Sequence, residues 1–168
     1  TGPFAIDMYL PALPAIEEAL GTSVSGAQAT LVAYFLAYGL AQLVYGPLSD
    51  QIGRKKTLFI GMSIFAVGAI ICAAAPSIAL LVVGRIIQGV GGAAVMVIPR
   101  AIVRDMYTGA QATRLMSAIM LVISISPMLA PLAGSAVVTF GTWREIFIAL
   151  AVLAVASLTT AQILLPET

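Results

Sequence analysis

The sequence contains no histidine and a single cysteine, Cys72. A lone cysteine cannot close an internal disulfide, and without histidine the chain offers no ordinary set of metal ligands. No nucleophilic side chain is accompanied by a base. We therefore expect no enzyme, no metal site and no cofactor.

Charge is also scarce, because only 9% of the 168 residues are charged whereas 61% are hydrophobic. So few polar groups cannot cover a soluble domain of this size. The net charge is +1, and no basic cluster is larger than Arg54, Lys55 and Lys56, which argues against a nucleic-acid partner. The expected surroundings are the lipid bilayer.

The charges are separated by apolar runs long enough to hold about 20 residues, the length that crosses a bilayer. Runs without Asp, Glu, Lys or Arg lie between Glu18 and Asp50, Lys56 and Arg85, Arg114 and Arg144, and Glu145 and Glu167. Breaks at charges, glycine and proline predict six segments, at about residues 1–16, 27–48, 57–75, 77–103, 112–138 and 144–165. The first segment is too short to span alone, so we expect its N-terminal half to be missing from the sequence.

Basic residues predict the orientation, because Lys and Arg accumulate on the cytoplasmic side. The second-to-third and fourth-to-fifth junctions carry Arg54, Lys55, Lys56, Arg104 and Arg114, and the alternate junctions carry only Arg144. We expect those two junctions and the N-terminus to be cytoplasmic. Lys55 and Lys56 are expected to set this orientation and to do nothing more.

An internal similarity suggests two three-helix units. The string GPLSDQIGRKKTLFIGMSIFAVGA, starting at Gly46, resembles APLAGSAVVTFGTWREIFIALAVLA, starting at Ala130, with four residues inserted in the second copy. Three is an odd number of spans, so the second unit must be inverted relative to the first, as in many transporters. The low complexity of apolar helices is the alternative origin of the match.

Asp7 stands inside the first segment, in DMYLPALPAI. Counting back from Ile16 at about 1.5 Å per residue places it roughly 13 Å deep, near the bilayer midplane. A carboxylate there should face a polar cavity, pair with a cation or be protonated. Pro11 and Pro14 should loosen the helix just beyond it. We interpret Asp7 as a proton or cation site; an acid that merely holds helices together is the alternative.

Arg85 is the corresponding buried cation, in LVVGRIIQGVGGAA of the fourth segment. Arg85, Gln88 and Gly92 share one helical stripe, which predicts a polar face turned to the bundle interior. Its guanidinium is a fixed positive charge that can act on a nearby acid or an anion. The alternative is an arginine that snorkels to the outer interface. The neighbouring Gly89 and Gly92 indicate close helix packing.

Aromatic and amide side chains recur along one face of the second segment, as Tyr34, Tyr38, Gln42 and Tyr45. Such a face can stack against a flat apolar or cationic ligand. Ordinary helix packing explains the same spacing.

Three motifs carry a family resemblance. GPLSDQIGRKKTL, residues 46 to 58, resembles the loop between spans two and three of the major facilitator superfamily, where Gly, Asp, Gly and two basic residues recur at these spacings. LVVGRIIQGVGGAA is similar to that family's fourth-span arginine motif, and SPMLAPLAGS to its fifth-span Gly-Pro motif, which is typical of antiporters. Together with DMYLPALP, these motifs resemble the Bcr/CflA group of drug:proton antiporters over essentially the whole chain.

This resemblance implies an all-α membrane fold, with residues 1–168 forming the N-terminal six-helix half of a twelve-span transporter and the second bundle absent. It implies proton-coupled efflux of amphipathic or cationic drugs across the bacterial inner membrane. The implied partners are the drug, protons, and a C-terminal six-helix half or a second copy. A nutrient symporter on the same fold and a non-transporting membrane binding or assembly module are the alternatives.

The resemblance and the residue patterns together assign four groups of residues. They are Asp7 and Arg85 for proton coupling; Tyr34, Tyr38, Gln42 and Gln88 for substrate; Gly46, Asp50, Gly53, Arg54 and Asp105 for a cytoplasmic conformational latch; and Pro127, Pro131 and Gly134 for a helix-bending motif. For the loop residues, a signal that only fixes membrane topology is the alternative.

Overall fold

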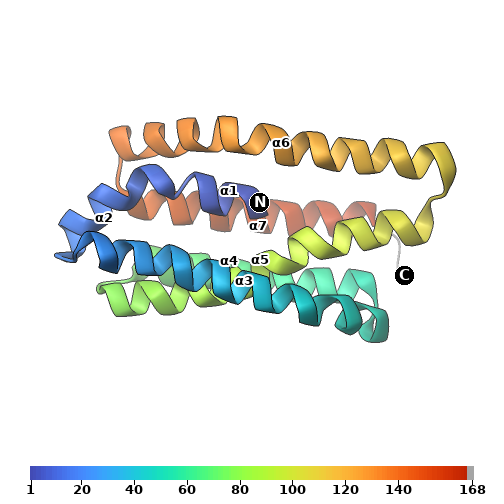
Figure 1. Cartoon of the computed structure of the whole chain (residues 1–168), viewed down its shortest axis with the longest axis horizontal. Helices are drawn as coiled ribbons and strands as arrows, with labels where there is room; N and C mark the ends of the chain where they lie inside the picture. Colours follow the sequence, from blue (N-terminus) through green and yellow to red (C-terminus); the bar gives the residue numbers. More distant parts are fainter. Residues whose placement is uncertain (166–168) are drawn as a thin grey trace.

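The computed structural model describes residues 1–165, and every regular element within that range is helical (Figure 1). The elements are α1 (Gly2–Asp7), the 3-10 helix η1 (Leu10–Ala12), α2 (Leu13–Leu20), α3 (Val24–Ile52), α4 (Arg54–Ala74), α5 (Ile78–Met106), α6 (Gly109–Phe140) and α7 (Trp143–Leu164). The five helices from α3 to α7 are each long and apolar enough to cross a membrane. The first predicted segment is the composite of α1, η1 and α2.

The first segment differs from its prediction at both its centre and its end. Its helix runs to Leu20 rather than Ile16, because the exposed Glu18 fits a helix surface and the left-handed Gly21, at φ 58°, ends the helix instead. The predicted loosening beyond Asp7 is confirmed: α1 ends at that residue, and η1 and α2 follow, each with a proline in its first turn. The bundle therefore has a broken helix in the segment that carries the acid.

Helix α5 occupies the centre of the bundle, packed against both α3 and α4. Gly91 of α5 lies against the backbone of Phe65 in α4, and Gly68 of α4 lies against the backbone of Gln88. On the other side, a Cβ on Gly89 would lie 2.6 Å from the Tyr34 carbonyl oxygen of α3. Close packing at Gly89 and Gly92, as predicted, is confirmed, and it leaves little room between these three helices.

Helices α4 and α7 form an antiparallel pair that is linked at both ends. Lys55, at the start of α4, donates through Nζ to the Leu165 carbonyl at the end of α7, at 2.7 Å. Arg144, at the start of α7, donates through Nη1 to the Ala73 carbonyl at the end of α4, at 2.8 Å. An inverted repeat produces such reciprocal contacts. The prediction that Lys55 only sets orientation was therefore wrong, because a cation also satisfies the free carbonyls at a helix C-terminus.

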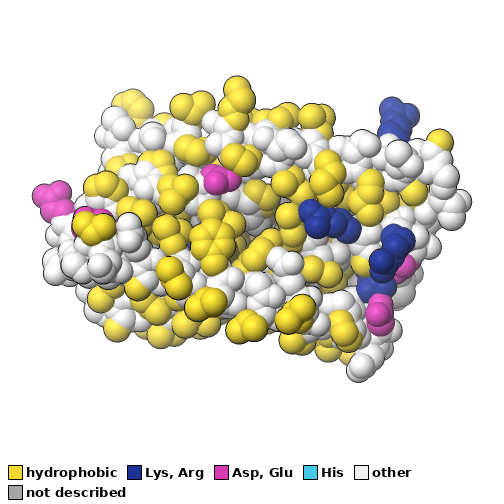
Figure 2. All heavy atoms as spheres, viewed as in Figure 1, with side chains coloured by type: hydrophobic (Ala, Val, Ile, Leu, Met, Phe, Trp, Pro, Cys, Tyr) yellow, Lys and Arg dark blue, Asp and Glu magenta, His cyan; other side chains and the backbone are white. Residues whose placement is uncertain are grey.

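Helix α6 lies along one edge of the bundle, and most of its apolar side chains are exposed (Figure 1). Its main contacts are with α1 and η1, where Gly134 lies against the Met8 carbonyl. Figure 2 shows charged side chains gathered mainly at the two ends of the long axis and hydrophobic ones between them. This distribution fits helices that cross a bilayer along that axis.

Candidate functional site

The site is centred on Arg85, which is completely buried in α5. Its Nη1 donates to Gln88 Oε1 at 2.7 Å and to the Ala5 carbonyl of α1 at 3.2 Å. A snorkelling arginine would place its guanidinium at the interface, so this alternative was wrong. The side chain instead joins the central helix to the broken first segment.

Three aromatic rings enclose the Arg85 guanidinium, and we call Tyr9, Tyr34 and Phe147 the arginine cage. The Arg85 Cζ atom lies 4.1 Å from the ring centroid of Tyr34 and 4.4 Å from that of Tyr9. The Phe147 centroid is 5.9 Å away. Each ring comes from a different part of the chain, and each offers the negative face of its π system to the cation. The cage thus stabilises a buried positive charge without a carboxylate.

Neither Tyr9 nor Phe147 was expected at the site from the sequence. Tyr9 hydrogen-bonds through its hydroxyl to Thr30 Oγ1 of α3, which fixes its ring against the arginine. Its place two residues after Asp7 is a signal that could have drawn attention to it. Phe147 lies in an ordinary apolar stretch of α7, and its local sequence contains no signal for this role.

Asp7 ends α1 and is only partly buried. Within residues 1–165 it forms no ion pair, and Arg85 bonds the Ala5 carbonyl instead of this carboxylate. The cationic partner that was one of the sequence-based options is therefore not found. The carboxylate is left accessible in the middle of the predicted span.

Several buried polar atoms near Arg85 have no hydrogen-bond partner within the described chain. They are the Nε and Nη2 atoms of Arg85, Nε2 of Gln88 and the hydroxyl of Tyr34. Buried polar groups are nearly always satisfied in folded proteins. This part of α3 and α5 therefore retains unused hydrogen-bonding capacity within an otherwise apolar bundle.

The four predicted substrate residues separate into two pairs. Tyr34 and Gln88 are fully buried and contact Arg85, whereas Tyr38 and Gln42 are partly exposed. The Tyr38 ring stacks on the Tyr34 ring, with centroids 5.8 Å apart and planes inclined by 18°. A stack of Arg85, Tyr34 and Tyr38 thus leads from the centre outward. Tyr45 packs among buried apolar side chains of α4 and α5, as ordinary helix packing requires.

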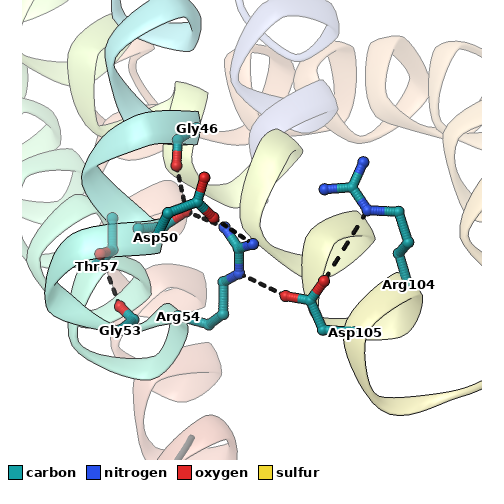
Figure 3. A network of polar contacts seen from close by, with 8 residues as sticks. Gly46, Asp50, Gly53, Arg54, Thr57, Arg104 and Asp105 are labelled. Atoms are coloured by element: carbon teal, nitrogen blue, oxygen red, sulfur yellow. Dashed lines mark hydrogen bonds and ion pairs between the residues drawn. The ribbon is translucent and has the colours of Figure 1, made fainter.

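A second charged group, which we call the Arg54 cluster, consists of Asp50, Arg54 and Asp105 and lies at the junction of α3 and α4 (Figure 3). The Arg54 guanidinium lies 2.5 Å from Asp50 Oδ1 and 2.8 Å from Asp105 Oδ2, and it also donates to Ser49 Oγ. The ends of α3, α4 and α5 are thereby joined through one side chain. Because the Asp50 side chain is 62% exposed, water competes for these contacts.

The two glycines of this junction have different surroundings. Gly53 separates α3 from α4 with φ at 97°, a conformation that favours glycine, and its carbonyl accepts from Thr57 Oγ1 at 2.8 Å. The Gly46 carbonyl accepts from Ser49 Oγ at 2.8 Å. Apart from its chain neighbours and the adjacent backbone of α3, no atom of the described residues lies within 4 Å of the point that a Gly46 Cβ would occupy. Packing within residues 1–165 does not explain a glycine at position 46.

The predicted helix-bending residues all lie within α6, which continues as one helix through Pro127 and Pro131. A Cβ on Gly134 would collide with the Met8 carbonyl. The motif therefore lets α6 approach the backbone of the first segment directly after Asp7.

Comparison with known proteins identifies the family of the chain. The model of the Major Facilitator Superfamily matches residues 2–168. The uncharacterized MFS-type transporter YdgK of Bacillus subtilis is 41% identical over 148 residues, which are 87% of this chain and 37% of that protein.

Two further relatives have names that refer to drug resistance. Multidrug resistance protein D of Escherichia coli is 33% identical over 99% of this chain and 42% of its own length. The bicyclomycin resistance protein homolog of Haemophilus influenzae is 34% identical over the same shares, 99% and 42%. The chain thus spans about two fifths of the length of these relatives. Because the family model and the relatives match nearly the whole chain, this multi-pass membrane protein belongs to the Major Facilitator Superfamily.

Proposed function

We propose that the chain is the N-terminal six-helix bundle of a transporter that exports amphipathic or cationic drugs across the bacterial inner membrane in exchange for protons. The names of its relatives, multidrug resistance protein D and a bicyclomycin resistance protein homolog, support this assignment. The N-terminus and the Arg54 cluster face the cytoplasm, as the basic residues of the junctions indicate.

One observation carries the coupling mechanism: Asp7 lies at a helix break in the middle of a span and has no ion-pair partner within residues 1–165. A carboxylate in such a place can take up and release a proton without first breaking an ion pair. Arg85 supplies a permanent positive charge beside the same segment, held by the arginine cage and the Ala5 carbonyl. Asp7 is the group that changes protonation, and Arg85 sets the field in which it does so.

The remaining residues are assigned by their exposure. Tyr38 and Gln42 face the substrate, while Tyr34 and Gln88 act through Arg85, which they contact. The Arg54 cluster is the latch that holds the cytoplasmic ends of α3, α4 and α5 in one conformational state.

A second six-helix bundle completes the transporter. The exposed apolar side chains of α3 and α6, among them Leu36, Leu43, Met128 and Leu132, offer it an interface, and alternating access requires one bundle to move against another. The bundle is either a C-terminal half or a second copy of this chain.

The decisive experiment is Asp7→Asn in proteoliposomes that contain this chain together with its second bundle. The amide keeps the shape of the side chain but cannot release a proton. Drug transport driven by a pH gradient should therefore stop, while drug binding in detergent persists. Glu18→Gln, which neutralises an exposed carboxylate at the other end of the same segment, should leave transport unchanged.

Undiminished coupled transport by Asp7→Asn would remove Asp7 from the mechanism. The same vesicles give the direction of coupling when drug flux and proton flux are both measured. Fluxes in opposite directions support antiport, and fluxes in the same direction would show a symporter.

A further inference from the structure

Arg100 is the second arginine of α5, after Arg85, and neither the sequence motifs nor the coupling mechanism uses it. It follows Pro99 and stands six residues before the end of the helix at Met106, so it lies about 9 Å inside that end. The side chain is partly buried.

The Arg100 side chain points away from the cytoplasmic end of its helix. Its Nη2 lies 3.7 Å from the Met96 sulfur, one turn earlier in α5 and thus deeper in the bilayer. Its Nε is buried and has no hydrogen-bond partner among residues 1–165. A snorkelling arginine would extend toward water, and thioether sulfur is only a weak acceptor. The guanidinium therefore lacks a strong hydrogen-bond acceptor although it is charged and partly buried.

The charges around Arg100 leave a positive excess. A cavity of about 270 Å³ is lined by Gly46, Asp50, Arg54, Val97, Arg100, Ala101, Arg104 and Met116. Arg54 is paired with Asp50 and Asp105, and Arg104 lies 4.0 Å from Asp105. Arg100 has no carboxylate partner within the described part of the chain, so the cavity holds one unneutralised guanidinium.

An apolar cavity lies next to this charged one. It measures about 390 Å³ between α1, α5 and α6, and its lining includes Met96 and Pro99, which precede Arg100 in α5, together with Pro3 of α1 and Leu115 and Ile119 of α6. A volume of this size suits the apolar body of a small ligand. The two cavities together present one cationic group beside an apolar pocket.

We propose that Arg100 forms an anion-binding subsite that takes the carboxylate, sulfate or phosphate of an amphipathic molecule, whose apolar body lies between α1, α5 and α6. A planar guanidinium with a free Nε, and with an Nη2 that contacts only a thioether sulfur, is suited to such oxyanions. Two kinds of molecule carry such an anionic group on an apolar body: a soluble amphiphile and an anionic phospholipid. The subsite concerns binding and does not depend on the direction or the coupling of transport.

The test measures binding of dansyl-undecanoic acid and of its uncharged methyl ester to the full chain in neutral detergent. The parent should prefer the acid by about tenfold or more, since hydrogen bonds between charged groups are strong in partly buried sites. Arg100→Gln should lose that preference while its affinity for the ester stays unchanged. Arg100→Lys should retain part of it, because the charge remains but the planar donor pair does not.

Arg114→Gln is the matched control, because this exposed arginine of α6 does not line either cavity, and it should bind like the parent. An unchanged preference in Arg100→Gln, or an equal loss of acid and ester affinity, would overturn the proposal. Competition with phospholipids distinguishes a soluble amphiphile from a phospholipid as the natural ligand. Displacement of the acid by phosphatidylglycerol but not by phosphatidylcholine supports a lipid at the subsite, and displacement by neither supports a soluble amphiphile.

Discussion

Arg85 and Arg54 each connect several helices, but their surroundings are opposite in kind. Arg85 is fully buried and contacts two tyrosine rings, an amide and a backbone carbonyl. The side chain of Arg54 is 13% exposed and contacts two aspartates, one of them largely in water. One arginine is therefore stabilised by neutral groups away from water, and the other by opposite charges beside it.

This difference suits Arg85 to a static structural role and Arg54 to a contact that can break and re-form. Interactions in a buried, low-dielectric site are strong and costly to break, so Arg85 is suited to remain in place throughout a transport cycle. Solvent-accessible ion pairs contribute only about 0–1 kcal/mol each, so those of Arg54 are weak enough to open and close again, as the proposed latch requires. Because Arg85 does not use a carboxylate, Asp7 has no ion-pair partner within residues 1–165, as the proposed proton exchange requires.

The largest effect is expected from Arg85→Lys. Lysine keeps the charge but cannot lie flat between the rings of the arginine cage. The loss of cation–π contacts and charged hydrogen bonds should lower stability by about 2 kcal/mol. The melting temperature in detergent should fall by about 5 °C, and transport should be lost.

Arg54→Lys provides the matched comparison for this prediction. Lysine can still pair with Asp50 or Asp105, so its melting temperature should stay within about 2 °C of the parent. Equal losses in the two variants would show that burial does not distinguish the two arginines.

A moderate effect is expected from Asp50→Asn, which removes one of the two ion pairs of Arg54. Turnover should slow several-fold, or the conformational equilibrium should shift, while expression and insertion stay normal because the count of basic residues is unchanged. Cysteine labelling of the central cavity from both sides of the membrane measures the shift. Unchanged labelling together with normal turnover would reduce this cluster to a topology signal.

The smallest effect is expected at Lys55, a cation that bonds a helix end instead of a carboxylate. Lys55→Gln should lower the stability by about 1 kcal/mol, since it removes one charge-assisted hydrogen bond to the end of α7. Lys56→Gln is the control, because it removes the same charge from the neighbouring exposed position. Thermal melting of both variants checks the contact, and identical melting curves would argue against it.

The sequence predicted the spans and the type of fold closely. Segments expected at 27–48 and 57–75 correspond to α3 (Val24–Ile52) and α4 (Arg54–Ala74), and the break after Asp7 follows from Pro11 and Pro14. These features are local, because the free energy of moving a segment into lipid is nearly a sum over its own residues, and proline acts on its own helix. The end of the first helix was missed, since acidic residues at an exposed end do not stop a helix.

The contacts of the site were decided by the tertiary structure. Helical periodicity places Arg85 and Gln88 on one stripe, but it does not say that Phe147 of α7 and Tyr9 of the first segment face that stripe. Nor does it say that Arg100 turns inward to Met96 or that Lys55 reaches the Leu165 carbonyl. Lipid solvates every apolar helix face about equally well. Hydropathy therefore carries no information about which helices pack against each other. Close approach at Gly89 and Gly91 fixes those neighbours, and only packed helices bring residues so distant in sequence around one guanidinium.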